Sequence, residues 1–151
     1  MVKLHSQKLL DDSKEYDKLI VAYLQSLGKR CDTADVLADK QDKYDIVVWS
    51  EKLDTMFIDT KYTTRPETRL FYETDKHKNS EANFIWYFLK NKNMTSFLIK
   101  KDALKKLTAG KRKYQAREGG DWLVDFSVNE LKKGTDYWCI CMSEAFHGRS
   151  I

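Results

Sequence analysis

The chain has little of what marks multi-part or membrane-embedded proteins. It has one proline in 151 residues, and it contains no internal repeat, no low-complexity tract and no linker. No window approaches the roughly 18 apolar residues that a membrane-spanning helix needs. These absences exclude a repeat array and a helical membrane span. The length suits one domain, residues 1–151, which can bury a sizeable core.

Cysteine is also scarce. The three cysteines are Cys31, Cys139 and Cys141, and the first residues lack the apolar stretch of a secretory signal. An odd count without a signal predicts reduced thiols in the cytoplasm. Cys139 and Cys141 would share one face of a strand, but no two further soft ligands stand at a suitable spacing for a metal site. We therefore expect them to be small core residues.

Charge and aromatic residues are plentiful. Hydrophobic residues make up 42% of the chain and aromatic residues 13%, which indicates a folded domain. Charged residues make up 33%, and the net charge of +4 accompanies a pI near 8.8. This mildly basic balance is compatible with a polyanionic partner but does not establish one.

The clearest helical pattern lies at residues 13–28. Its apolar residues recur at steps of three and four: Tyr16, Leu19, Ile20, Tyr23, Leu24 and Leu27. This spacing is typical of an amphipathic helix. Ser13 is the expected N-cap, and Gly28 is the expected stop.

Strand patterns dominate the rest of the chain. Residues 44–49 and 55–62 are rich in β-branched and aromatic residues, and the loop between them is short enough for a hairpin. Residues 80–92 are apolar almost all round, which predicts a buried helix. We also expect a strand at 95–101, a short helix at 102–110, a basic loop at 111–120, and strands at 121–128 and 136–142. This order predicts an α/β (α+β) domain with a central mixed sheet flanked by helices.

Three charged residues interrupt the two hairpin runs. Asp59 and Lys61 share one face of the second run, and Asp45 opens the first. Antiparallel pairing would bring the two carboxylates together, and they would repel each other unless a cation lay between them. Mg²⁺ prefers oxygen ligands and usually takes one or two carboxylates, and the main-chain carbonyl of Thr60 can add another ligand. Lys61 would then face the same pocket, to orient a water or offset charge on a phosphate.

A plainer interpretation is that Asp45 lies at a solvated strand end and that Asp59 and Lys61 form an exposed ion pair. Such a pair would contribute less than about 1 kcal/mol. The context favours a site, because the charges lie inside runs that otherwise alternate towards burial, and a buried unpaired charge costs several kcal/mol.

The pattern "YDIVVW…MFIDTKY" resembles the PD-(D/E)xK nuclease superfamily, which has the restriction-endonuclease-like fold. Asp45 matches its first acid, Asp59 its second and Lys61 its lysine, while Tyr44 stands where the name has proline. The superfamily often adds an acid from an N-terminal helix. Glu15 is the best match for that acid, at the edge of the apolar stripe, and Asp12 is the alternative. The resemblance implies a Mg²⁺- or Mn²⁺-dependent phosphodiesterase that usually acts on DNA.

Two basic segments are candidates for contact with nucleic acid. Residues 100–117 carry eight basic residues and one acid, and glycines bracket their loop. A second cluster follows Lys61 near the strand end. The candidate contacts are Arg65, Arg69, Lys111, Arg112, Lys113 and Arg117. Ordinary solvated lysines and arginines are the alternative interpretation of both segments.

The leading functional hypothesis is a metal-dependent DNA endonuclease, of the kind that the resemblance associates with phages and mobile elements. Cutting both strands usually needs two active sites, so a homodimer is compatible with it. One alternative is a catalytically inactive nuclease-fold domain that binds nucleic acid or protein. Another is an unrelated protein-interaction domain, which would leave Asp45 and Asp59 exposed and apart.

Overall fold

A computed structural model describes residues 2–34, 44–50, 55–64, 69–74, 81–90 and 94–142, with side chains described from residue 13 onwards. The elements, in chain order, are α1 (Val2–Ser26), β1 (Arg30–Thr33), β2 (Ile46–Trp49), β3 (Met56–Thr63), β4 (Leu70–Glu73), β5 (Phe84–Leu89), β6 (Thr95–Lys100), α3 (Lys101–Thr108), β7 (Tyr114–Gln115), β8 (Trp122–Phe126), the 3₁₀ turn η1 (Val128–Glu130) and β9 (Tyr137–Cys141).

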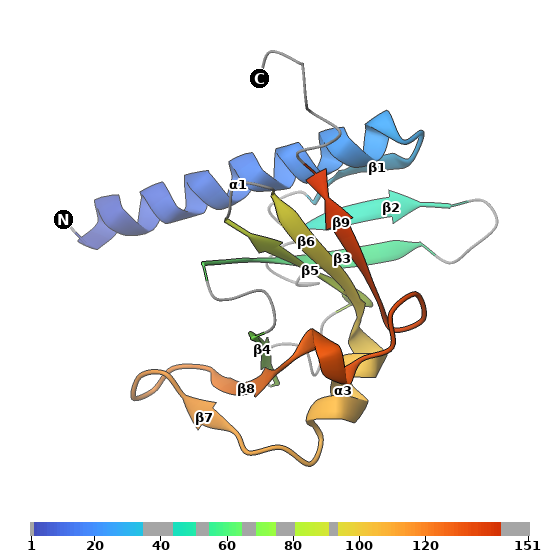
Figure 1. The fold of residues 1–151 in the computed structure, drawn as a ribbon. Helices are drawn as coiled ribbons and strands as arrows, with labels where there is room; N and C mark the ends of the chain where they lie inside the picture. Colours follow the sequence, from blue (N-terminus) through green and yellow to red (C-terminus); the bar gives the residue numbers. More distant parts are fainter. Residues whose placement is uncertain are drawn as a thin grey trace.

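The centre of the fold is a six-stranded sheet in the order β1-β2-β3-β5-β6-β9 (Figure 1). Neighbouring strands are antiparallel except for β3 and β5, which are parallel. The chain is thus a mixed α+β domain, as its sequence predicted. No helix in the described ranges has both the length and the apolar character that a membrane crossing requires.

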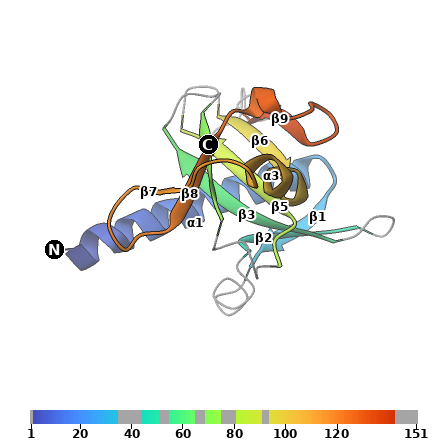
Figure 2. The same cartoon turned by 90° about the horizontal axis from the view of Figure 1, so that it is seen from below.

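Helix α1 covers one face of this sheet. Ile20 and Val21 are buried against Ile46, Ile58 and Phe88 of the strands. The helix begins well before the expected cap at Ser13, and its N-terminal half extends past the sheet in two views (Figures 1 and 2). It ends at Ser26, and Gly28 follows with a φ of 83°, a conformation that glycine adopts without strain.

Strand β5 corrects the expected helix at residues 80–92. Its residues face two different cores in alternation. Ile85, Tyr87 and Leu89 belong to one core, whereas Trp86 and Phe88 belong to the core under α1. A strand that is covered on both faces is apolar at every position, which is the same pattern that a buried helix gives. Short length and aromatic enrichment favoured the strand.

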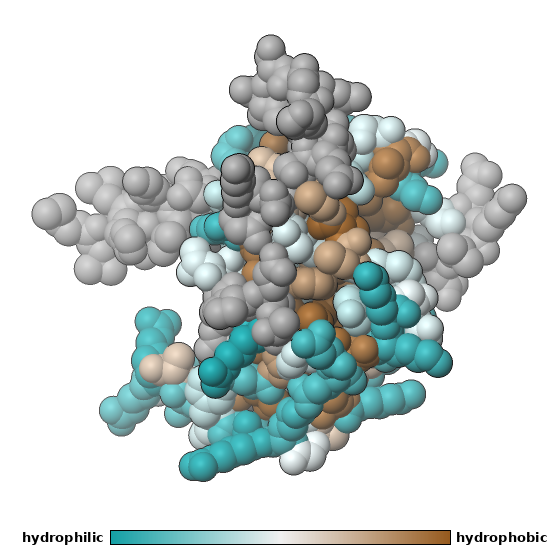
Figure 3. Space-filling model, viewed as in Figure 1, coloured by the Kyte–Doolittle hydropathy of each residue, from teal (hydrophilic) through white to brown (hydrophobic). Residues whose placement is uncertain are grey.

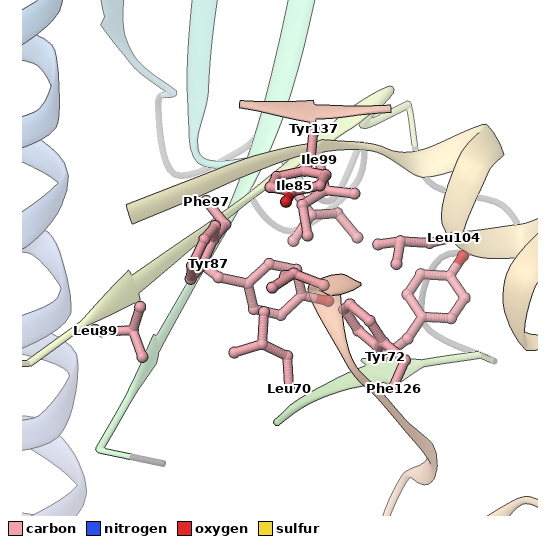
Figure 4. Packing of buried hydrophobic residues seen from close by; sticks show 11 residues of the cluster. Leu70, Tyr72, Ile85, Tyr87, Leu89, Phe97, Ile99, Leu104, Phe126 and Tyr137 are labelled. Carbon is pink, nitrogen blue, oxygen red and sulfur yellow. The ribbon is translucent and has the colours of Figure 1, made fainter. Parts of the chain in front are cut away.

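A second layer covers the opposite face of the sheet. It consists of α3 and a three-stranded sheet in the order β4-β8-β7 (Figures 1 and 2). Leu70 and Tyr72 of β4, Leu104 of α3 and Phe126 of β8 pack with the central strands in one hydrophobic cluster (Figure 4). The expected short helix and the expected strand at 121–128 are confirmed, β4 was not expected, and the expected basic loop contains the short strand β7. Cys139 of β9 is exposed and Cys141 is half-buried, so the expectation that both are core residues is wrong.

The β2–β3 hairpin sets the register of the candidate site. Ile46 pairs with Ile58, and the backbone N–H of Asp45 donates to the carbonyl of Ile58 at 2.8 Å. This bond is one residue out of the ladder register, so Asp45 is an extra residue at the start of β2, and the next β3 amide, that of Thr60, donates to the Asp45 side chain instead of to a backbone carbonyl. The expected antiparallel hairpin is confirmed.

Candidate active site

Two carboxyl groups meet where β2 begins. Asp59 lies in the middle of β3 and is only 2% exposed, and Asp45 is partly buried beside it. A hydrogen bond between the two side chains places their carboxyl groups in contact. The arrangement expected of an unrelated interaction domain, with both groups exposed and apart, is therefore not observed.

The electrostatics of this pair are unfavourable without a cation. Burial, followed by the nearby Asp59 carboxylate, raises the pKa of Asp45 from 3.8 to about 8. A hydrogen bond with Asp59 and the charge of Asp17 raise it further, while the hydrogen bond from the Thr60 N–H acts in the opposite direction. At neutral pH one proton is therefore retained within the carboxylate cluster. A divalent cation would relieve the same repulsion.

Thr60 connects this pair to a third acid on α1. Its backbone N–H donates to Asp45 Oδ2 at 2.8 Å, and its hydroxyl lies 3.1 Å from the same oxygen. The hydroxyl also donates to Asp17 Oδ1 at 2.7 Å, and the Tyr62 hydroxyl donates to that oxygen as well. Asp17 is buried, and it lies behind Asp45 on the α1 face of the sheet.

Asp17 was not among the helix acids that the sequence pointed to. Glu15 does not reach the sheet, because its side chain is 71% exposed and pairs with Lys18 at 3.3 Å along the helix. The side chain of Asp12 lies outside the described residues. A spacing signal for Asp17 was present, since it precedes Ile20, Val21 and Leu24 at steps of three, four and seven.

Lys61 lies between two carboxylates. Its Nζ is 3.3 Å from Asp59 Oδ2, and it donates to Glu73 Oε1 at 2.7 Å. All three side chains are largely buried. Glu73 comes from β4 in the three-stranded sheet, and sequence reasoning missed it because this contact spans two sheets and follows no local spacing. Lys101 at the start of α3 is a second buried lysine, and burial lowers its pKa.

The residues present fit a Mg²⁺ or Mn²⁺ ion that keeps several waters. No group of three or more His, Cys, Asp or Glu side chains within the described ranges is arranged to hold a metal ion. The candidate donors are instead the Asp45 and Asp59 carboxylates and the carbonyl of Thr60. That carbonyl points to the Asp45 side of β3, as the Thr60 N–H does, because both groups of a strand residue face the same neighbour. Mg²⁺ typically uses only one or two carboxylates.

The basic residues are dispersed over the second layer. Arg112 and Lys113 are exposed between α3 and β7, whereas Lys111 donates to Glu130 at 2.7 Å. Arg65 lies outside the described residues. Hydrophilic side chains gather over α3 and the three-stranded sheet in the lower part of the view in Figure 3. This layer therefore presents a charged surface next to the site.

Arg117 and Arg69 lie near opposite ends of β4. Arg117 lines a hollow of about 310 Å³ together with Glu73, the partner of Lys61. Arg69 precedes β4, pairs with Asp125 at 3.7 Å and lines another hollow of about 340 Å³. Four residues of extended chain place Arg69 about 13 Å from Glu73 along the strand. Of these two arginines, Arg117 is the one that shares a hollow with a residue of the site.

Protein-family models, curated proteins and solved structures were all compared with the chain, and none matches it.

Proposed function

We propose that this protein is a metal-dependent phosphodiesterase that cleaves DNA, with a restriction-endonuclease-like fold. One observation carries the proposal: Asp45 and Asp59 lie together where β2 begins, Asp59 buried and Asp45 partly buried, with Lys61 beside Asp59 at 3.3 Å. A purely structural role would not require two neighbouring acids, where burial and then the charge of Asp59 raise the pKa of Asp45 to about 8. The sequence resemblance to the PD-(D/E)xK nucleases supports the same assignment.

Asp45, Asp59 and the Thr60 carbonyl would hold the cation. When bound, a divalent ion supplies charge neutralisation at the phosphate and lowers the pKa of a nearby water. Lys61 contributes a second, permanent positive charge, which offsets the negative charge that develops on phosphate oxygens during attack. Its ammonium is held by Asp59 and Glu73, so it needs no reorganisation during the reaction.

Asp17 takes the place in the proposal that the resemblance gave to Glu15. It is buried, and the Thr60 hydroxyl connects it to Asp45. From this position it fixes the Thr60 side chain and, through it, the carboxyl group of Asp45. DNA would approach over the second layer, where Arg117 adjoins Glu73 and where Arg112 and Lys113 are exposed.

The test is cleavage of supercoiled plasmid and of labelled oligonucleotides with Mg²⁺ or Mn²⁺. We expect nicking by the wild-type protein, no nicking in excess chelator, and loss of nicking in Asp59→Asn. Asp32→Asn is the matched control, because Asp32 is exposed on the edge strand β1 and should leave activity unchanged. DNA binding without cleavage of any substrate would instead support the inactive nuclease-fold module.

A further inference from the structure

Glu73 is the residue through which the second layer contacts the candidate site. It ends β4, and its Oε1 accepts a hydrogen bond of 2.7 Å from Lys61 Nζ on β3. Both side chains are nearly nine-tenths buried. An exposed ion pair contributes little to stability or geometry, whereas a buried pair with short contacts restricts both partners.

A second hydrogen bond holds β4 next to Lys61. Tyr87 is the residue that pairs with Lys61 in the parallel β3–β5 ladder, and its hydroxyl donates to the carbonyl of Phe71 at 2.8 Å. Phe71 precedes Glu73 by two residues on β4. Neighbouring residues of the central sheet thus make two separate contacts with one short strand.

Two carboxylates flank the Lys61 ammonium group, one as a hydrogen-bond acceptor and one as an ion-pair partner. An ammonium group has three N–H donors and rotates freely unless its acceptors hold it. Glu73 and Asp59 approach the Lys61 nitrogen from different strands, at 2.7 and 3.3 Å. The hydrogen bond to Glu73 and the ion pair with Asp59 together restrict where the Lys61 ammonium group lies.

We propose that Glu73 is a positioning residue for Lys61, and that the three-stranded sheet thereby sets the orientation of the charge that faces the phosphate. This inference rests on the proposed phosphodiesterase function. Glu73 touches neither the phosphate nor the cation in this scheme, and it acts only through Lys61.

The test is a double-mutant cycle measured under single-turnover conditions on a labelled duplex oligonucleotide with Mg²⁺. Glu73→Ala should lower the cleavage rate by about tenfold to a hundredfold, because a charge-assisted hydrogen bond is lost. The KM and the Mg²⁺ affinity from calorimetry should each stay within about twofold. Glu73→Gln keeps a hydrogen-bond acceptor for Lys61, so its cleavage rate should fall less than that of Glu73→Ala. In a Lys61→Ala background, Glu73→Ala should change the residual rate by less than about twofold.

Tyr87→Phe is the matched control for docking of the second layer. It removes the other hydrogen bond to β4 but leaves the Lys61–Glu73 pair in place. We expect a lower melting temperature with a cleavage rate within about threefold of wild type.

Three results would overturn the positioning role. The first is an unchanged cleavage rate in Glu73→Ala. The second is an equal decrease in cleavage rate when Glu73→Ala is made with Lys61 present and with Lys61→Ala. The third is a weaker Mg²⁺ affinity in Glu73→Ala, which would make Glu73 part of the cation site. If the wild-type protein cleaves no substrate, the proposed function fails. The coupling between Glu73 and Lys61 is then tested by the melting temperatures of wild type, the two single alanine variants and the double variant. Additive shifts reject it, and non-additive shifts support it.

Discussion

The two faces of strand β3 handle buried acids in different ways. On the α1 face, Asp17 accepts hydrogen bonds from two neutral hydroxyls, those of Thr60 and Tyr62. On the opposite face, Asp59 has the charged Lys61 beside it, and Lys61 is shared with Glu73. One strand therefore has a carboxylate held by neutral hydroxyl donors on one side and a lysine–carboxylate cluster on the other, because its side chains alternate.

The difference indicates which face is organised for structure and which for chemistry. The Asp17 network adjoins a hydrophobic core, in which the Tyr62 ring lies 5.1 Å from that of Tyr16 and 5.7 Å from that of Phe88. The ionic cluster has more negative than positive groups at its edge, since Asp45 joins Asp59 there and its pKa is raised. An excess of buried negative charge favours binding of a cation, whereas on the α1 face hydroxyl donors already hydrogen-bond the Asp17 carboxylate.

The largest expected effect comes from removing the positive charge of the ionic face. Lys61→Ala should lower the cleavage rate by about a hundredfold to a thousandfold, because a preorganised charge at the phosphate is lost. DNA affinity, measured by fluorescence anisotropy in Ca²⁺, should change by less than about threefold. Full cleavage by this variant would mean that the ionic face does not act in catalysis.

The pH dependence of protein stability should report the raised pKa of Asp45. The folded-state pKa of Asp45 is raised from 3.8 to about 8, so the folded protein binds the extra proton between these values. The stabilisation that comes from this bound proton is complete below about pH 4 and is lost as the pH rises through about 8. Between pH 5 and pH 8, wild type should therefore lose about 4 kcal/mol more than Asp45→Asn in urea unfolding without metal, because each pH unit across this window is worth about 1.4 kcal/mol. Equal pH profiles would contradict a carboxyl pair in close contact.

A smaller effect is expected at the charged surface beside the ionic face. Lys111→Ala/Arg112→Ala/Lys113→Ala should weaken DNA binding by about tenfold and reduce the salt slope by about two, because Lys111 is already paired with Glu130. Arg117→Ala should reduce the slope by about one. Arg69→Ala is the matched control at the far end of β4 and should leave the slope unchanged. An unaltered slope in the triple variant would remove residues 111–113 from the DNA interface.

The smallest effect is expected on the α1 face. Tyr62→Phe removes one neutral hydrogen bond to Asp17 and keeps the ring in the core, so it should lower the free energy of unfolding by about 1 kcal/mol. Cleavage should stay within about threefold of wild type. A loss of cleavage comparable to that of Lys61→Ala would show that the two faces are not separate in function.

Local pattern alone determined much of this protein. The period of the apolar residues determined the helix before Gly28, and the β-branched runs determined the β2–β3 hairpin with Asp45, Asp59 and Lys61 in its strands. These features follow from spacing within a single segment or between two segments joined by a short loop. The mixed α+β class follows from the order of such segments.

Tertiary structure decided the rest. Residues 84–89 form a strand because two cores cover both of its faces, and sequence period cannot distinguish that from a buried helix. Asp17, rather than Glu15, lies at the sheet; it shares the helix face of Ile20 and Val21, a spacing that the sequence carried, but only the packing shows that an acid on that face is buried. Glu73 meets Lys61 because the β4-β8-β7 sheet docks on the central one. Contacts between separately formed layers depend on how the layers pack, and no local spacing encodes that.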